Sequence, residues 1–216
     1  MAELPSFIAF TGLDNPAQIG DLRELSARYP IEWGVLVDDA QTEKPLFPDA
    51  EKRKAFVTAG GLRLAAHVCG EQARRIANEP DSVDVELFGY SRVQVNHSFT
   101  GSSAAHIENT VYFGRKIGVR SMLQFSKETP SDSRLDWLFD VSFGTGVAPT
   151  AWPTLAKNGP FVGFSGGIGP DTVKDVLKAI DAPQGVQYWI DMESRIRTDG
   201  YLDLNKCEAV CRAVYG

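Results

Sequence analysis

The sequence has no long apolar run and no excess of basic residues, and each absence removes a class of protein. No apolar stretch approaches the roughly 20 residues that a membrane-spanning helix needs, so we expect no contact with a membrane. The 22 Lys and Arg residues stand against 28 Asp and Glu, giving a net charge of -6. Because the basic residues form no cluster, we expect no nucleic-acid partner. The first residues lack a basic segment followed by an apolar one, which predicts a cytoplasmic protein without a secretion signal.

Cysteine is scarce as well. The 3 cysteines cannot all pair, and a reducing cytosol keeps thiols free, so a disulfide framework is excluded. Cys207 and Cys211 are four residues apart, which places both on one face of a helix that we expect to be buried. No second pair of Cys or His follows to complete a zinc site. We expect no cofactor and no metal.

What the chain has instead is a regular alternation of two patterns. Short apolar, β-rich runs recur along it, and stretches of helical spacing follow most of them. We predict strands at residues 7–10, 31–37, 62–68, 92–96, 119–125, 137–141, 161–164 and 186–190. We predict helices at residues 16–29, 48–59, 71–78, 103–116, 149–157, 171–180 and 204–214. Segment 126–134 is too short and polar for a full helix, so one outer helix is expected to be missing.

This alternation predicts the fold. Strands that alternate with helices pair in parallel through right-handed crossovers, and eight such units in 216 residues indicate closure into a barrel. We therefore predict an α/β protein, a (β/α)8 or TIM barrel, with residues 1–216 forming one domain. An open doubly wound sheet is the alternative, but it has fewer strands, and the segment after Phe7 lacks the glycine fingerprint of a dinucleotide site.

Glycine-rich sequence follows the seventh predicted strand. Residues 165–173 read Ser-Gly-Gly-Ile-Gly-Pro-Asp-Thr-Val, and Ser194 follows the eighth strand. Adjacent glycines let the backbone approach an oxyanion, and the loops after strands seven and eight of a (β/α)8 barrel commonly bind phosphate. We predict that Gly166, Gly167 and Ser194 bind the phosphate group of a small molecule.

Short motifs at five predicted strands share one family pattern. In chain order they are 10–15 (Phe-Thr-Gly-Leu-Asp-Asn), 93–96 (Val-Gln-Val-Asn), 138–140 (Leu-Phe-Asp) with 144–146 (Gly-Thr-Gly), 166–173, and 190–194 (Ile-Asp-Met-Glu-Ser). Together they resemble the phosphoribosylanthranilate isomerase family. The last two motifs are the most specific, and the others add to them by their order along the chain.

The resemblance implies an isomerase of tryptophan biosynthesis that carries out an Amadori rearrangement on a phosphorylated sugar derivative. In that reaction a general acid protonates the ribose ring oxygen and a general base removes the proton at C2. The resemblance places the acid at Asp140 and a second motif aspartate at Asp191. It also places Gln94 and Asn96 at the substrate. Small barrels of this kind occur as monomers and homodimers, and we expect one of these two states.

Several positions depart from the family pattern. Thr11 stands where the family has its cysteine base, and a hydroxyl is too weak an acid to replace a thiolate. Asn96 stands where the family has a histidine. The family's carboxylate-binding arginine has no counterpart at 37–41, and Lys44 substitutes only if its loop folds back. Glu193 replaces a serine, and a carboxylate beside a phosphate weakens binding unless it points away or meets an arginine.

Other polar residues at predicted strand ends are candidates for the missing base. His67 and Cys69 are two residues apart, so both side chains can point to one face of the third predicted strand. Histidine titrates near neutral pH, and cysteine becomes nucleophilic if its pKa falls. We therefore predict the catalytic set Asp140, Asp191, His67, Cys69 and Thr11.

These residues lead to a predicted function with alternatives. We predict an enzyme that isomerises a phosphorylated sugar derivative by acid–base chemistry, on a substrate shifted from the family's own because Thr11 replaces the cysteine. Retention of the family reaction, with Asp14 or Cys69 as the base, is a sister hypothesis. Two further classes remain open. One is a phosphate-binding barrel without catalysis, and the other is a metal-dependent lyase or aldolase with His67, His97 and Asp140 as ligands.

Overall fold

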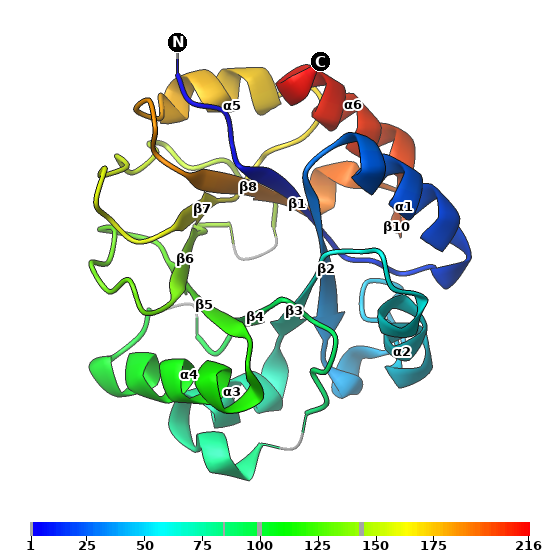
Figure 1. The fold of residues 1–216 in the computed structure, drawn as a ribbon, viewed down its shortest axis with the longest axis vertical. Helices are drawn as coiled ribbons and strands as arrows, with labels where there is room; N and C mark the ends of the chain where they lie inside the picture. The colour runs from blue at the N-terminus through cyan, green and yellow to red at the C-terminus, as the bar shows by residue number, and fades with distance from the viewer. Residues whose placement is uncertain (1, 84, 99–100, 143–144) are drawn as a thin grey trace.

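Eight parallel strands form a closed barrel in chain order, which confirms the predicted TIM barrel (Figure 1). This computed structural model describes residues 2–83, 85–98, 101–142 and 145–216. Every strand begins and ends within two residues of its predicted bounds. The strands are β1 (Phe7–Thr11), β2 (Ile31–Val37), β3 (Leu64–Val68), β4 (Arg92–Val95), β5 (Arg120–Phe125), β6 (Asp136–Phe139), β7 (Val162–Phe164) and β8 (Tyr188–Met192).

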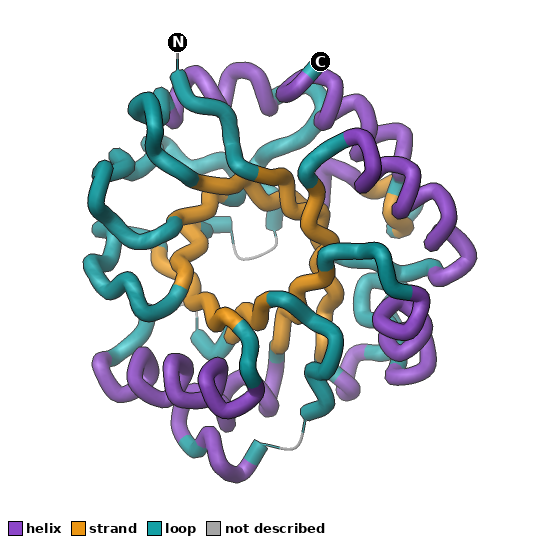
Figure 2. Tube along the Cα trace, in the orientation of Figure 1, coloured by secondary structure: helices purple, strands orange, loops and turns teal. Residues whose placement is uncertain are grey.

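Helices surround most of the strand ring (Figure 2). In the described part of the chain they are α1 (Ile19–Arg28), α2 (Ala50–Ala59), α3 (Gly70–Asn78), α4 (Ala104–Ile117), α5 (Val173–Ile180) and α6 (Leu204–Tyr215). Short 3-10 turns are η1 (Pro16–Gln18), η2 (Asp39–Gln41), η3 (Pro80–Ser82) and η4 (Ser194–Ile196). A small hairpin of β9 (Arg197–Thr198) and β10 (Tyr201–Leu202) precedes α6. None of the described helices is long and apolar enough to cross a membrane.

Side-chain caps fix where several helices begin. Asp49 accepts a hydrogen bond from the amide of Lys52 at the start of α2. Ser103 and His106 form a reciprocal capping box at the start of α4. Asp203 accepts from two amides in the first turn of α6. Each cap satisfies backbone donors that have no partner within the helix, so these residues set the lengths of the loops that lead into α2, α4 and α6.

Loops rather than helices cover the barrel wall outside β6 and β7, whereas α4 lies beside β5 (Figures 1 and 2). Residues 126–135, all of them described, contain no helix, in agreement with the sequence prediction. The predicted helix at 149–157 is wrong, because this segment is irregular. Pro153 would fall inside that helix, where it lacks an N–H and its ring clashes with the carbonyl one turn earlier. Trp152 instead packs against Phe139 and Phe164, with ring centroids 6.0 and 5.8 Å away, and covers the wall.

The strands are buried on both faces, as parallel strands of a barrel must be. Alternate side chains point into the barrel. In its middle they form a small apolar cluster, separate from the larger core beneath the helices. The cluster contains Phe7, Ala9, Met122, Leu138 and Trp189.

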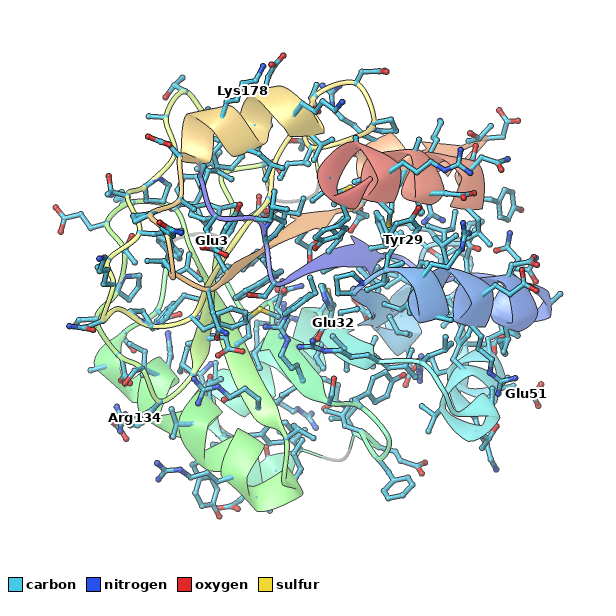
Figure 3. The ribbon with its side chains drawn as sticks, turned by 45° about the horizontal axis from the view of Figure 1, so that its top comes forward. Glu3, Tyr29, Glu32, Glu51, Arg134 and Lys178 are labelled. Atoms are coloured by element: carbon cyan, nitrogen blue, oxygen red, sulfur yellow. The ribbon has the colours of Figure 1, made fainter. Side chains whose placement is uncertain are left out.

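A buried ion cluster lies below these residues, at the N-terminal end of the barrel. The Nε of Arg92 is 3.0 Å from Oε2 of Glu32, and its Nη1 is 3.0 Å from Oδ2 of Asp136. Its guanidinium also lies 4.3 Å from the ring centroid of Trp189. Figure 3 places Glu32 within the strand ring, whereas Lys178 lies on the outer helix α5. Because the three charged side chains are buried, this end of the barrel is closed.

The cysteines of α6 face the core as predicted. Cys207 and Cys211 are both fully buried and free. Burial raises the pKa of both thiols, that of Cys211 to about 12, so neither is a thiolate at neutral pH. They act as small apolar side chains that pack α6 against the barrel.

Candidate functional site

One cavity of about 760 Å³ opens at the C-terminal end of the strands. This is the end at which (β/α)8 enzymes carry their active sites, because the loops that follow the strands converge there. All ten residues predicted from the sequence line this cavity, although the roles predicted for them remain predictions. They are Thr11, His67, Cys69, Gln94, Asn96, Asp140, Gly166, Gly167, Asp191 and Ser194.

Asp191 lies on β8 and is the most deeply buried carboxyl of the cavity wall. Thr11, on the neighbouring strand β1, donates its hydroxyl to the two carboxyl oxygens at 3.1 and 3.2 Å. Burial raises the pKa of Asp191 well above its ordinary value, the hydrogen bond from Thr11 opposes the rise, and the nearby carboxyl groups of Glu193 and Asp140 add to it. Asp191 therefore keeps its proton to a higher pH than an exposed aspartate does.

Asp140 follows β6 and has a different environment. Its Oδ1 accepts hydrogen bonds from the amide and the hydroxyl of Ser142, at 2.7 and 2.8 Å. Its Oδ2 accepts from Nε2 of Gln124 at 3.1 Å. These donors hold the Asp140 carboxyl group in place in the cavity wall. Gly144, part of the motif that follows Asp140, lies outside the described residues.

His67 and Cys69 both reach the cavity from β3, as their spacing predicted. Burial lowers the pKa of His67 to about 3, and the charge of Arg92 adds to this effect. Burial raises the pKa of Cys69 to about 11, although a hydrogen bond from Asn96 opposes the rise. A neutral imidazole and a protonated thiol result at neutral pH. An acid–base role for this pair required a lowered pKa of the Cys69 thiol, and that pKa is raised instead.

A chain of hydrogen bonds joins Cys69 to β4. The thiol of Cys69 donates to the carbonyl of His67 at 3.6 Å, and its sulfur accepts from Nδ2 of Asn96 at 3.3 Å. The Oδ1 of Asn96 in turn accepts from Nε2 of Gln94 at 2.6 Å. Each link fixes the orientation of the next amide, so the carbonyl oxygen of Gln94 is left as an acceptor without a partner among the described residues.

The glycine loop, residues 165–169, follows β7 at the rim of the cavity. Gly166 and Gly167 have φ of 108° and 66°, which favours glycine. A Cβ on Gly167 would stand 2.8 Å from the Cβ of Ala148, so the β6–β7 segment packs closely against this loop. Among the described residues, the amides of Gly166 and Gly167 have no hydrogen-bond partner. Two free amides therefore remain at the rim.

The β8 loop completes this part of the rim. Ser194 is exposed, and its hydroxyl lies beside Gly146 of the β6–β7 segment. Arg195 crosses the glycine loop, because a Cβ on Gly169 would stand 2.6 Å from its own Cβ. Within the part of the chain that the structure describes, the guanidinium of Arg195 forms no ion pair. The Arg195 side chain thus packs against the glycine loop at Gly169, although it does not line the cavity.

Glu193 lines the cavity, and the sequence analysis treated it only as an obstacle to phosphate. Burial raises its pKa to about 7, with the charge of Arg197 lowering it and that of Asp140 raising it. The carboxyl group is therefore partly neutral at physiological pH, which weakens the expected repulsion. The position of Glu193 after the eighth strand was the only sequence signal, and burial could not be inferred from it.

Two proposed substitutes do not reach the cavity. Asp14, considered as an alternative base, pairs with Arg197 and accepts a hydrogen bond from the amide of Leu202 at 2.9 Å. Lys44, considered as a carboxylate ligand, donates to Gln41 at 2.8 Å in the exposed β2–α2 loop. Neither residue lines the cavity, so each has a structural role in its loop.

The predicted metal set is not assembled. His97 lies at the cavity edge, but its ring packs against His106 with centroids 4.5 Å apart, and its Nε2 is 2.9 Å from the hydroxyl of Ser102. No group of three His, Cys, Asp or Glu side chains in the described ranges is placed to hold a metal ion. The ligand set of His67, His97 and Asp140 is therefore not supported.

Other polar residues of the cavity were not predicted from the sequence. Gln124 and Ser142 hydrogen-bond to Asp140, and Arg74 extends from α3 to the rim, where it pairs with Glu71 at 2.8 Å. Gln124 ends an inward-facing alternation on β5, and Arg74 lies one turn into the helix that follows β3. Both positions are visible in the sequence once the strand ends are known.

Comparison with solved structures connects this barrel with known enzymes. The chain matches N-(5'-phosphoribosyl)anthranilate isomerase from Pyrococcus furiosus with a TM-score of 0.62 and 16% identity, over 96% of this chain and 98% of that one. A monomeric form of phosphoribosylanthranilate isomerase from Thermotoga maritima gives 0.62 and 11%, over 97% and 98%. The chain has the fold of these isomerases. The predicted resemblance is therefore confirmed at the level of the fold.

A third structure shares the barrel but carries another name. It is 3-hexulose-6-phosphate synthase from Salmonella typhimurium, with a TM-score of 0.52 and 10% identity over 96% of this chain and 98% of that one. No family model and no curated protein sequence matches the chain. At such low identity one fold serves several reactions, so the function has to be argued from the residues of the cavity.

Proposed function

We propose that this protein is an enzyme that binds a phosphorylated sugar derivative and isomerises it by proton transfer between two carboxyl groups. The observation that carries the proposal is that one cavity combines two free glycine amides at its rim with two aspartates, Asp140 and Asp191, held in contrasting environments. A pair of acids whose environments differ in this way is the usual requirement for acid–base catalysis.

The rim supports binding of the phosphate. Free amides of Gly166 and Gly167 can donate to phosphate oxygens, as glycine-rich loops of this fold do. Arg195, next to the same loop, can supply the positive charge that a phosphate dianion needs. Glu193, with a pKa raised by burial to about 7, can hold a proton beside the anion and donate a hydrogen bond to it.

The deeper aspartates support the chemistry, with Asp191 as the acid and Asp140 as the base, so Asp140 takes a role other than the acid role that the resemblance implied. Asp191 holds its proton and can give it to the ring oxygen of a sugar, which opens the ring. Asp140, whose carboxyl group is held in place by Ser142 and Gln124, can accept the proton from C2. As the C2 proton leaves, Asp191, protonated again by the C1 hydroxyl proton released on ring opening, protonates the C1 oxygen and an enediol forms. Asp140 then gives its proton to C1 while the C2 hydroxyl gives its proton to Asp191, which yields the ketose and restores both carboxyl groups. Protons move within the site, and no oxidant or reductant is required.

The experiment measures binding and proton transfer separately. Titration calorimetry follows inorganic phosphate and ribose 5-phosphate, and NMR follows deuterium uptake from solvent at C2 of ribose 5-phosphate. We expect Gly167→Ala to lose binding of both, because a Cβ there meets Ala148 and strains a backbone of positive φ. We expect Asp140→Asn to bind both normally but to lose C2 exchange by about 100-fold or more.

Two results would contradict the proposal. Normal phosphate binding by Gly167→Ala would remove the rim site. Binding without any C2 exchange in the wild-type protein, on any phosphosugar tried, would leave the barrel as a ligand-binding protein. Growth of a tryptophan auxotroph carrying this gene would show that the reaction is that of phosphoribosylanthranilate isomerase itself.

A further inference from the structure

Two buried polar atoms on the floor of the cavity have no partner. They are Nε2 of His67 and Oε1 of Gln94, and neither forms a hydrogen bond with any residue that the structure describes. The two residues are register partners on β3 and β4, and both side chains line the cavity. Buried polar groups are nearly always hydrogen-bonded in folded proteins. An unpaired pair at the bottom of an open cavity therefore indicates a bound partner.

The hydrogen bonds already made by Gln94 determine which hydrogen bonds a ligand has to offer to His67 and Gln94. Nε2 of Gln94 donates a hydrogen bond to Oδ1 of Asn96, and Nδ2 of Asn96 donates one to the sulfur of Cys69. Oε1 of Gln94 is therefore left as an acceptor. His67 is a neutral imidazole, which carries one donor and one acceptor nitrogen. A ligand group that satisfies both residues has to donate at least one hydrogen bond. Hydroxyl groups do so, whereas an ionised carboxylate can only accept.

His67 packs closely against β2 on one side. Gly34 of β2 separates His67 from Thr11, and a Cβ at this position would stand 3.0 Å from Nε2 of His67 and 2.5 Å from Oγ1 of Thr11. The absence of a side chain thus lets the imidazole and the hydroxyl that supports Asp191 pack directly against the backbone of β2. A ligand group therefore reaches His67 from the cavity that its side chain lines, and not from the β2 side.

The floor offers an anion no free positive charge. Asp140, Asp191 and Glu193 line the same cavity. In the described part of its lining the one cation is Arg74, which lies on α3 and is paired with Glu71. Arg92 lies below the floor, but its guanidinium is already engaged by Glu32 and Asp136. A carboxylate on the floor would therefore meet acceptors and acids with no free positive charge.

We infer that the substrate end opposite the phosphate is an uncharged, hydroxyl-bearing chain that hydrogen-bonds to His67 and Gln94, and is not an aromatic carboxylate. This inference rests on the proposed function for the phosphate end and adds the class of the substrate. The chain is thus built for a phosphorylated polyhydroxy compound of the open-chain sugar type. The absence of an arginine counterpart at 37–41 agrees with it.

A matched pair of ligands tests the inference. Glucitol 6-phosphate and 6-phosphogluconate share six carbons and a phosphate, and they differ in that the far end is a hydroxymethyl group or a carboxylate. We expect glucitol 6-phosphate to bind about tenfold or more tightly than 6-phosphogluconate, because only the hydroxymethyl group can donate to the floor. Inorganic phosphate serves as the probe of the rim alone.

Substitutions on the floor separate the two ends of the ligand. Gln94→Met removes the acceptor at similar volume, and we expect it to weaken glucitol 6-phosphate about tenfold while inorganic phosphate binds as before. His67→Leu should act in the same direction. Gln187→Met makes the same exchange at an exposed position and should change neither ligand. Circular dichroism and thermal unfolding confirm that each variant is folded.

The outcomes can be told apart. If phosphate binds but 6-phosphogluconate binds as tightly as glucitol 6-phosphate, the inference is overturned and the rim site stands. The same holds if Gln94→Met and His67→Leu, both folded, leave glucitol 6-phosphate unchanged. If neither phosphate nor either ligand binds the wild-type protein, the proposed function fails, and the inference fails with it.

Discussion

The hydroxyl of Thr11 donates a hydrogen bond shared between the two carboxyl oxygens of Asp191, at 3.1 and 3.2 Å. The two residues lie on adjacent strands, β1 and β8, which close the barrel. Thr11 occupies the position at which the isomerase motif has its cysteine, but its hydroxyl is directed at a buried acid. Its contact therefore assigns it to support Asp191 rather than to remove a proton.

Removal of this hydroxyl should raise the pKa of Asp191 further, because the hydrogen bond from Thr11 opposes the effect of burial. In Thr11→Val we expect the carbon-13 signal of the Asp191 carboxyl to titrate at higher pH than in the wild type, and C2 exchange to fall about tenfold. Thr11→Ser keeps the donor and is the control. An unchanged titration in Thr11→Val would show that the hydroxyl does not act on Asp191.

Glu193 should make the stability of the protein depend on pH. Its folded pKa, about 7, is above its ordinary value of 4.5, so the folded state binds the proton more tightly. Its contribution to stability is complete below pH 4.5 and is lost as the pH rises through about 7. Glu193→Gln cannot ionise, so its free energy of unfolding, relative to the wild type, should increase across this range. Urea denaturation at several pH values measures it, and a constant difference would contradict it.

The ion cluster at the closed end should be costly to break. Arg92→Met leaves Glu32 and Asp136 buried without a counter-charge, and we expect a loss of about 3–5 kcal/mol in the free energy of unfolding. Lys178→Met, which breaks an exposed pair with Asp175, is the control and should have little effect. Urea denaturation of both variants measures the difference. Equal stability of the two variants would mean that Arg92 does not compensate these carboxylates.

Cys69 should behave as an inert thiol. Burial raises its pKa to about 11, so very little thiolate exists at neutral pH. We expect iodoacetamide at pH 7.5 to label it far more slowly in the folded protein than in urea, as followed by peptide mass spectrometry. Cys69→Ala should keep C2 exchange within about threefold, since the thiol orients Asn96 but transfers no proton. Rapid labelling together with a large loss of exchange would restore Cys69 as the base.

The alternation of the sequence was sufficient to predict the strands, because a parallel barrel strand is buried on both faces and reads as a short apolar run. The helix predicted at 149–157 failed because pattern alone did not weigh Pro153 against the apolar spacing around it. Trp152, which suggested a helix face, instead covers the wall that the missing helix would have covered. Its tertiary partners, Phe139 and Phe164, are distant in the sequence.

The candidate residues were found because parallel strands bring their C-terminal ends to one rim, so a polar residue after each strand is near all the others. Their chemistry was not predictable in the same way. His67 and Cys69 have the residue types of an acid–base pair, but burial shifts both pKa values away from neutrality. Glu193 shows the reverse case, because burial moves an ordinary carboxyl group toward neutral pH. Burial depth is a property of packing that the sequence does not state.

The buried ion cluster of Arg92, Glu32 and Asp136 also determines by which end of the barrel a ligand can enter and leave. Because the cluster closes the N-terminal end of the barrel, a ligand enters and leaves through the opening at the C-terminal end of the strands. The glycine loop lies at that opening. If the proposed function holds, a phosphorylated molecule enters with its uncharged end first and its phosphate docks last. Release of the phosphate would then be the first step of departure, so the affinity of the glycine loop for that group would set how soon the next molecule can enter.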